Sequence, residues 1–157
     1  MSLDLLRVLA EPGQPQSTYA LLDRLIQERV GHHQLTLLVV DGDEVARVFS
    51  TTPDSYPVGG RKPMGPTPWG EKVLKRQEIF LGRTAADIEW AFFDHATIMG
   101  LGLGSIINVP VVYDGQTLGT INSSHREHFY GPEHVAPVAE LAPLLVPAFL
   151  EARRSLR

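Results

Sequence analysis

The chain has 157 residues, 43% of them apolar, which is enough for one domain with a proper core and short for two. Its 14 Lys and Arg residues stand against 18 Asp and Glu residues, and the formal charge of −4 excludes a large positive field for the phosphate backbone of a nucleic acid. The absence of cysteine excludes disulfides, thiolate metal sites and cysteine-based catalysis.

The N-terminal residues 1–16 are expected to form an arm ahead of a single domain over residues 17–157. A short helix over residues 2–10 would carry three leucines on one side and end at Pro12. The acidic Asp4 and the shortness of the apolar stretch argue against a signal peptide and against a membrane span. We therefore expect a soluble, cytoplasmic protein with no membrane partner.

The first long helix is predicted over residues 17–30, where apolar residues recur at helical spacing and Gly31 provides the stop. Two apolar strands over residues 35–40 and 45–50 flank the acidic turn 41–44. This pattern predicts a β-hairpin.

Residues 52–68 hold five prolines and three glycines, a composition that excludes a helix or a central strand. Long loops in compact domains are often functional, so residues 52–66 are predicted to form a mobile lid, with a flexible surface loop as the equal alternative. A threonine and a proline at positions 67 and 68 then open a helix to about residue 77. A short strand is predicted at residues 79–82.

A capping box at Thr84 predicts a helix that continues to Met99. Its apolar residues cover nearly the whole circumference, so we expect it to pack on the sheet and also to wall a cavity, with plain core packing as the alternative. His95 on this helix is interpreted as a core histidine. The glycine-rich residues 100–104 are interpreted as a helix stop, because a dinucleotide-binding loop would follow a strand and precede a helix.

Residues 105–124 are the stretch around which the chain is organised. Two β-branched strands are joined there by Asp114-Gly115, a dipeptide typical of a tight hairpin turn. Alternation on the second strand places one set of side chains, Gly119, Ile121 and Ser123, toward the helices of the core. The intervening side chains, Thr120 and Asn122, are expected to point to the opposite side.

A final helix is predicted from residue 131 to about residue 154, with a buried stripe and three prolines that would kink it. Together the elements predict the α+β class. We expect one central antiparallel β-sheet of about five to six strands, with helices on its faces.

Several short motifs, in their order along the chain, resemble those of GAF domains. They are Thr67-Pro68-Trp69-Gly70, Gly102-Leu103-Gly104-Ser105, Val109-Pro110, Asp114-Gly115 to Gly119, and Phe129-Tyr130-Gly131-Pro132-Glu133. The resemblance covers residues 17–154 and implies a stand-alone GAF-like domain with a profilin-like or PAS-like sandwich. It also implies a sensory or regulatory module of signal transduction, with a small-molecule ligand held between the sheet and the covering loop and helices. A homodimer through the terminal helices is implied as well.

Differences from known branches of this family reduce the number of ligands and reactions that the chain could support. Ser123 stands where cyclic-nucleotide-binding members carry a lysine, which disfavours cyclic nucleotides. Free methionine sulfoxide reductases resemble lone GAF domains of this length but need cysteines, and bilin-attaching members need a cysteine thioether. The cofactor therefore stays unknown: a covalent chromophore is excluded, and a non-covalent small molecule, including haem bound through a histidine, stays open.

The predicted ligand site combines an aromatic wall with polar groups of the hairpin. Asn108 and Asn122 interrupt apolar strands, and a buried amide needs a partner because leaving it unpaired costs about 1 to 3 kcal/mol. The predicted ligand-binding residues are Trp90, Phe93, Asn108, Thr120 and Asn122. In the alternative interpretation, both asparagines bond only to loop backbone.

No catalytic and no metal-binding residue is predicted. His125 and His128 lie in a polar segment before a helix, where histidines are usually solvated, and no nucleophile has a base at a suitable spacing. The leading hypothesis is a non-catalytic ligand-binding module. A structural dimerisation module without ligand is second. An enzyme related to free methionine sulfoxide reductase but lacking its cysteines is third.

Overall fold

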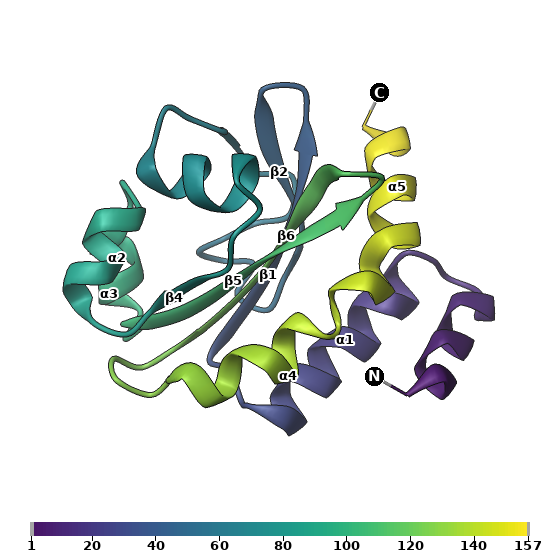
Figure 1. The fold of residues 1–157 in the computed structure, drawn as a ribbon, viewed down its shortest axis with the longest axis horizontal. Helices are drawn as coiled ribbons and strands as arrows, with labels where there is room; N and C mark the ends of the chain where they lie inside the picture. Colours follow the sequence, from purple (N-terminus) through teal and green to yellow (C-terminus); the bar gives the residue numbers. More distant parts are fainter. Residues whose placement is uncertain (1, 157) are drawn as a thin grey trace.

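A six-stranded antiparallel sheet runs through the computed structural model, which describes residues 2–156 (Figure 1). The strand order is β3-β2-β1-β6-β5-β4, and every neighbouring pair is antiparallel. The strands are β1 (Gln34–Asp41), β2 (Glu44–Ser50), β3 (Arg61–Pro63), β4 (Phe80–Gly82), β5 (Ser105–Tyr113) and β6 (Gln116–His125). The predicted α+β class and number of strands are confirmed.

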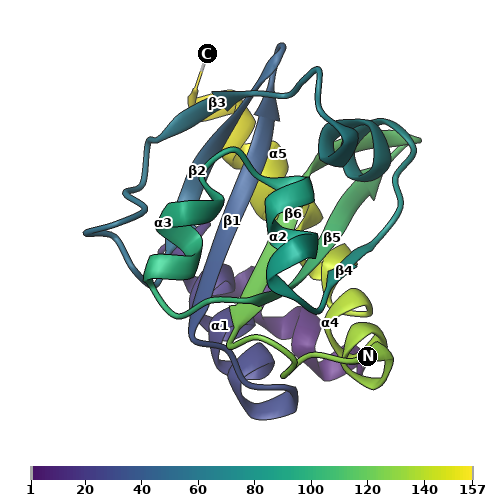
Figure 2. The ribbon, with the colours of Figure 1, turned by 90° about the vertical axis from the view of Figure 1, so that its left-hand side faces the viewer.

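Helices cover both faces of this sheet (Figures 1 and 2). One face carries α1 (Gln16–Arg29), α4 (Val135–Ala139) and α5 (Val146–Ser155). The other carries α2 (Ala85–Ala91), α3 (His95–Gly100) and a π-helical segment, η2 (Gly70–Lys75). Each face has its own buried cluster, because successive side chains of a strand point to opposite faces. We call the first cluster, which includes Leu37, Ile121 and Phe149, the helix-side core, and the second, which includes Leu38, Val45 and Trp69, the cavity-side core.

The helix-side core takes alternate residues from the central strands. Leu37 on β1 and Ile121 on β6 belong to it. Gly119 lies under the ring of Phe149 on α5, since a Cβ at this glycine would come within 2.8 Å of that ring. Ser123 Oγ is 2.7 Å from a tyrosine hydroxyl of the segment before α4. The predicted orientation of this face of β6 is therefore confirmed.

Both predicted hairpins are present. The β5–β6 turn is the dipeptide Asp114-Gly115, with φ angles of 53° and 70°, and two such residues match the twist of a two-residue hairpin loop. The β1–β2 turn is tighter than the predicted four residues, because Asp41 and Glu44 already pair with each other. Gly42, with φ 66°, takes the left-handed position in that turn.

The proline-rich segment over residues 52–68, which we call the excursion, contains a strand that the sequence did not predict. Residues Arg61–Pro63 form β3 at the edge of the sheet, where Lys62 pairs with Val45 of β2. The composition excludes a central strand but not an edge strand, since one side of an edge strand needs no hydrogen-bond donors. This pairing brings the middle of the excursion against the sheet.

The helix predicted from Thr84 to Met99 is wrong in its continuity. The capping box at Thr84 is present, but α2 ends at Ala91 and the next residue, Phe92, has extended backbone (φ −132°, ψ 132°). The ring of Phe92 then packs toward Trp69, with 5.8 Å between ring centroids. The predicted burial of this segment on several sides is wrong as well, because much of α2 and α3 is exposed.

The C-terminal helix is present but divided at its prolines into η3 (Pro132–His134), α4, η4 (Ala142–Leu145) and α5. Pro143 and Pro147 lie in the first turns of η4 and α5, where a residue without N–H is tolerated. By length and composition alone, residues 132–155 could cross a membrane. In this fold, however, Leu145 and Phe149 are fully buried in the helix-side core.

The N-terminal residues Leu3–Ala10 form a 3-10 helix, η1, that contacts α1. Val8 is buried and Leu5 packs against the helix-side core. Ser17, the first residue of the predicted helix, lies inside α1, and its hydroxyl donates to the Pro12 carbonyl. Residues of the expected arm therefore contact the rest of the fold.

Candidate functional site

A cavity of about 610 Å³ lies on the face of the sheet that carries α2, α3 and η2. The sheet forms its floor. Its walls come from the excursion between β2 and η2 and from the turn between α2 and α3. Figure 2 looks onto this side of the molecule, with α2 and α3 in front of the sheet and β3 across its edge.

The floor consists of side chains that alternate along the three central strands. Thr36 of β1 pairs with Asn122 of β6, and Asn122 pairs in turn with Asn108 of β5. Ser124 and Ile106 form the next paired row. Because directly paired residues of antiparallel strands share a face, the register places these polar side chains in rows across the cavity floor.

A chain of hydrogen bonds, which we call the asparagine relay, crosses this floor. The indole Nε1 of Trp69 donates to Asn108 Oδ1 at 3.0 Å, and Asn108 Nδ2 donates to Asn122 Oδ1 at 2.7 Å. Asn122 Nδ2 donates to the Thr36 carbonyl at 3.2 Å. Both asparagines are buried. Within residues 2–156 each NH2 group makes one hydrogen bond, so each keeps a second N–H beyond the relay.

Lys62 and two aromatic rings form one wall of the cavity. The Lys62 Nζ lies 4.8 Å from the ring centroid of Trp69 and 5.4 Å from that of Phe92. Burial lowers the pKa of Lys62, Asp94 raises it in part, and Arg47 lowers it further. Burial disfavours the charged form of an amine, so this ammonium occupies a poorly hydrated position.

Side-chain contacts tie the excursion to the α2–α3 turn. The Tyr56 hydroxyl donates to Asp94 Oδ2 at 2.5 Å, and the Arg47 guanidinium carbon lies 4.8 Å from the Tyr56 ring centroid. Burial first, and then Asp94, raise the pKa of Tyr56, so its hydroxyl stays protonated as a donor. Arg47 also donates to the Pro57 carbonyl at 3.1 Å. The predicted lid therefore has specific polar anchors in this conformation.

Three of the five predicted ligand-binding residues line the cavity, namely Phe93, Asn108 and Asn122. Thr120 shares the face of Asn122 but is fully buried outside the lining, and its hydroxyl has no partner within residues 2–156. Trp90 also lies outside the lining, is 49% exposed and packs on Phe80 with ring centroids 5.5 Å apart. Phe93 is 90% exposed and lies after the end of α2, so the two aromatics do not form one helical wall.

The alternative interpretation of the asparagines is also wrong in its detail. Asn108 and Asn122 bond to each other, to an indole and to a strand carbonyl, not to loop backbone. Sequence reasoning missed Trp69, Lys62 and Arg47 as lining residues. Of these three residues, only Arg47 could have been found from the sequence, because a charged residue within an apolar predicted strand suggests a functional position.

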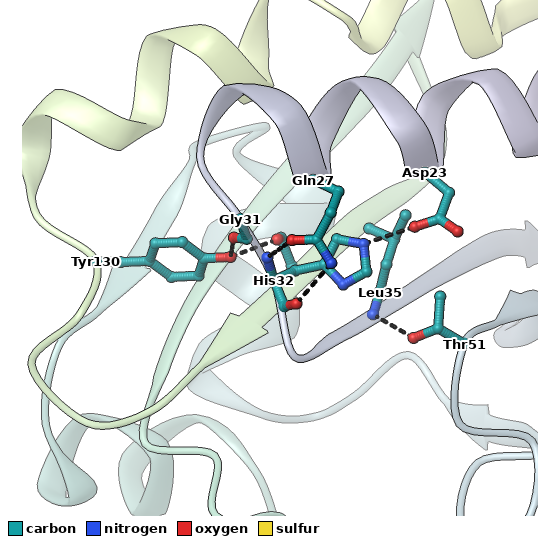
Figure 3. A network of polar contacts seen from close by, with 8 residues as sticks. Asp23, Gln27, Gly31, His32, Leu35, Thr51 and Tyr130 are labelled. Carbon is teal, nitrogen blue, oxygen red and sulfur yellow. Dashed lines mark hydrogen bonds and ion pairs between the residues drawn. The ribbon is translucent and has the colours of Figure 1, made fainter.

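A second polar network fixes the passage from α1 into β1 (Figure 3). The His32 backbone N–H donates to Gln27 Oε1 at 2.8 Å, and the His32 Nε2 lies 2.6 Å from Asp23 Oδ1. The Tyr130 hydroxyl donates to the Gly31 carbonyl at 2.6 Å. Burial raises the pKa of Tyr130 to about 12, so this donor stays protonated at neutral pH. The network stabilises the left-handed turn at Gly31, where φ is 79°.

His125 ends β6 within a stack of rings beside this network. Its ring centroid lies 3.8 Å from that of His33 and 3.5 Å from that of Phe129, and its Nδ1 accepts the Arg126 backbone N–H at 2.9 Å. Burial, followed by the charges of His33 and Arg126, lowers the pKa of His125 to about 4. Across residues 2–156, no group of three or more histidine or acidic side chains is arranged to hold a metal ion.

Acid is expected to destabilise the fold through His125. The ordinary histidine pKa is 6.5, so below that pH the unfolded chain binds a proton at this residue, whereas the folded chain binds it only near pH 4. With screening by solvent taken into account, the free energy of unfolding should therefore fall by about 1 to 2 kcal/mol from this residue as the pH falls from 7 to 4.5. Urea unfolding at both pH values measures this change.

The variant His125→Asn is expected to lose most of that pH-dependent difference, because an amide oxygen can still accept the Arg126 N–H without titrating. The partly exposed His95 provides the matched control, and His95→Asn should keep the pH dependence of the wild type. An unchanged pH dependence in His125→Asn would show that the acid sensitivity arises elsewhere.

Comparisons with known proteins agree with this architecture. The family model of the GAF domain matches residues 19–149. The GAF domain of a phosphoenolpyruvate-protein phosphotransferase from Coxiella burnetii is similar with a TM-score of 0.74, at 23% identity over 98% of this chain and 95% of that one. The GAF domain of a two-component sensor histidine kinase from Bacillus halodurans gives a TM-score of 0.75, at 12% identity over 92% and 99% of the two chains.

A third similar structure is that of an enzyme. The type II free methionine-R-sulfoxide reductase from Thermoplasma acidophilum has a TM-score of 0.64, at 16% identity over 87% of this chain and 92% of that one. A search among curated proteins finds no match to this chain. At these identities the structural likenesses show a shared fold.

Proposed function

This chain belongs to the GAF domain family, a family of sensory and regulatory ligand-binding modules, and we propose that it binds a small molecule in the cavity beside Trp69. The cavity is the observation that carries the proposal. Its volume of about 610 Å³, its aromatic and apolar walls and its few polar groups on rigid strands are the usual make-up of a small-molecule site. The role proposed is binding without a chemical step.

Similar structures support a task in signalling. One is the GAF domain of a two-component sensor histidine kinase, and another is a region of a methyl-accepting chemotaxis protein. We propose that this chain serves a comparable sensory task in the cytoplasm.

The excursion offers a way to report whether the cavity is occupied. Its contacts through Tyr56 and Asp94 close one side of the cavity, and β3 holds Lys62 in the wall. A bound molecule would add contacts to both sides and hold the excursion more firmly. Ligand binding would then change the order of the segment between β2 and η2, which a partner protein or domain can read.

Native mass spectrometry of freshly purified protein is expected to show a retained small molecule. Ala91 lines the cavity and is 7% exposed, so Ala91→Phe should fill part of the space and weaken retention at least tenfold. Ala86→Phe is the matched control, because Ala86 is exposed on the same helix outside the cavity lining and the change should leave retention unaltered.

Thermal-shift screening against a set of metabolites provides the same test when the molecule is lost during purification. A ligand at 100 times its Kd raises the free energy of unfolding by about 2.7 kcal/mol. Wild type and Ala86→Phe should show this shift, and Ala91→Phe should not. Absence of both a retained mass and a thermal shift in the wild type counts against the proposal.

We also propose a homodimer formed through the terminal helices. Leu3 and Leu6 on η1 and Leu150 on α5 are exposed, and these helices lie on the same side of the sheet (Figure 1). Exposed leucines on one side of a fold favour association. Sedimentation velocity is expected to show a dimer that Leu150→Glu weakens at least tenfold, whereas Leu101→Glu, at an exposed leucine after α3, should leave it intact. A monomer at all concentrations would refute the dimer.

A further inference from the structure

We infer that the ligand of this cavity is a small organic anion, with an aromatic or apolar body and one negatively charged oxygen group held by Lys62. This inference rests on the proposed function, because it names the class of molecule that the cavity takes. Its basis is the distribution of charge and of unused hydrogen-bond donors around the cavity.

The cavity lining carries positive charge in a chain whose formal net charge is −4. Three basic residues and one acidic residue line it: Arg47, Arg61, Lys62 and Asp94. Arg61 is neutralised by carboxylates outside the lining, at 2.7 Å from Asp41 and 3.2 Å from Glu44. The remaining two cations, Arg47 and Lys62, face a single carboxylate within the lining, that of Asp94.

Lys62 is the cation that the fold directs inward. Its partner across the β2–β3 ladder is Val45, which is fully buried in the cavity-side core. Within residues 2–156, Lys62 makes no hydrogen bond and no ion pair, and its ammonium lies over the faces of Trp69 and Phe92. The ammonium has thus lost hydration without gaining an anionic partner in contact, which is a costly arrangement for a cation.

Further donors around the cavity have no acceptor among residues 2–156. The Nε atom of Arg47 is buried without a partner, and the amides of Asn108 and Asn122 each keep one N–H beyond the asparagine relay. A carboxylate, sulfonate or phosphate offers only acceptors, so it matches this set of donors and the ammonium together. The rings of Trp69 and Phe92 supply an apolar surface for the rest of the molecule.

A matched pair of fluorescent probes separates this inference from the proposed function. N-phenyl-1-naphthylamine is neutral, and 8-anilino-1-naphthalenesulfonate has the same ring system with one added sulfonate. Binding of the neutral probe tests the cavity. The ratio of the two affinities tests the preference for an anion.

The wild type should bind the sulfonate at least tenfold more tightly than the neutral probe. Lys62→Gln should lower the affinity for the sulfonate about tenfold and change that for the neutral probe less than twofold. The matched control is Lys75→Gln, because Lys75 is exposed on η2 outside the cavity lining, and it should leave both affinities unchanged.

Two results would overturn the inference. If the neutral probe binds and the sulfonate shows no advantage, the cavity binds ligands without selecting anions. If the sulfonate keeps its advantage in Lys62→Gln, Lys62 is not the residue that holds the anion. In both cases the inference fails and the proposed function stands alone. If neither probe binds the wild type, the proposed function and the inference both fail.

Two further measurements keep the test decisive if Lys62→Gln does not fold. Rising NaCl concentration should weaken binding of the sulfonate to the wild type relative to the neutral probe, because it screens the contact between charges. Lys62→Arg, which keeps the positive charge, should retain the preference for the sulfonate. A salt-independent ratio, or a lost preference in folded Lys62→Arg, rejects Lys62 as the anion-binding residue.

Discussion

Replacing Asn108 with leucine is expected to lower the free energy of unfolding by about 3 kcal/mol. The substitution removes the central member of the asparagine relay and leaves the Trp69 indole N–H and the Asn122 Oδ1 without partners. Both groups are buried, and each unpaired buried polar group costs about 1 to 3 kcal/mol. Leucine has the same branched shape as asparagine, so the substitution removes the hydrogen bonds while keeping a side chain in the same place.

Urea unfolding followed by circular dichroism measures this loss. Gln16→Leu makes the same kind of change, from an amide to an apolar side chain, at an exposed position on α1, and it should alter stability by less than about 0.5 kcal/mol. A loss below about 1 kcal/mol in Asn108→Leu would mean that the relay contributes little to the folded state.

Replacing Gly119 with alanine is the second large expected loss, about 3 kcal/mol or more. An added Cβ would come within 2.0 Å of the Leu38 carbonyl oxygen on β1 and within 2.8 Å of the Phe149 ring on α5. The strand and the helix must then move apart, because neither a backbone carbonyl nor a fully buried ring can give way locally. Since a domain of this kind is stable by only about 5 to 15 kcal/mol, this loss should be visible as a lower melting temperature.

Gly100→Ala is the matched control for that substitution. An added Cβ at Gly100 meets nothing within 4 Å, and this glycine closes the helix α3. Alanine favours the helical conformation, so the change should be neutral or raise the free energy of unfolding by about 0.5 kcal/mol. Equal melting temperatures for Gly119→Ala and the wild type would contradict the close packing of α5 on the sheet.

The sequence predicts those elements whose signals are local. The β5–β6 hairpin follows from the Asp114-Gly115 turn and from the alternation of the two strands, and the same alternation correctly separates Ile121 from Asn122. The capping box at Thr84 likewise marks the start of α2. In each case the determining residues lie within a few positions of one another, so tertiary contacts add little to the assignment.

The missed features depend on contacts between distant parts of the chain. Phe92 leaves the helical conformation where its ring packs toward Trp69, and no glycine or proline marks that break. β3 exists because β2 offers an open edge, which the composition of the excursion does not reveal. Its pairing then sets the position of Lys62, so a lysine in an apparently irregular loop becomes part of the cavity wall.

The sequence therefore predicts the floor of the candidate site but only one residue of its aromatic wall, Phe93. Asn108 and Asn122 stand out because they are amides in apolar strands, and the structure places both on the cavity floor. The aromatic wall was assigned to Trp90 and Phe93 because the helix was expected to continue past Ala91, and the ring that contacts the relay belongs to Trp69 instead.

The most direct measurement of the central claim uses the two tryptophans of the chain, which give two indole N–H signals in a protein labelled with 15N-tryptophan. Trp69 lines the cavity and donates its indole N–H to Asn108, whereas Trp90 lies outside the lining. Titration with N-phenyl-1-naphthylamine is predicted to shift the Trp69 signal progressively and to leave the Trp90 signal in place, with Trp90→Phe assigning the two. A Trp69 signal that stays unmoved up to the solubility limit of the probe, or a shift confined to Trp90, would contradict a small-molecule site in this cavity.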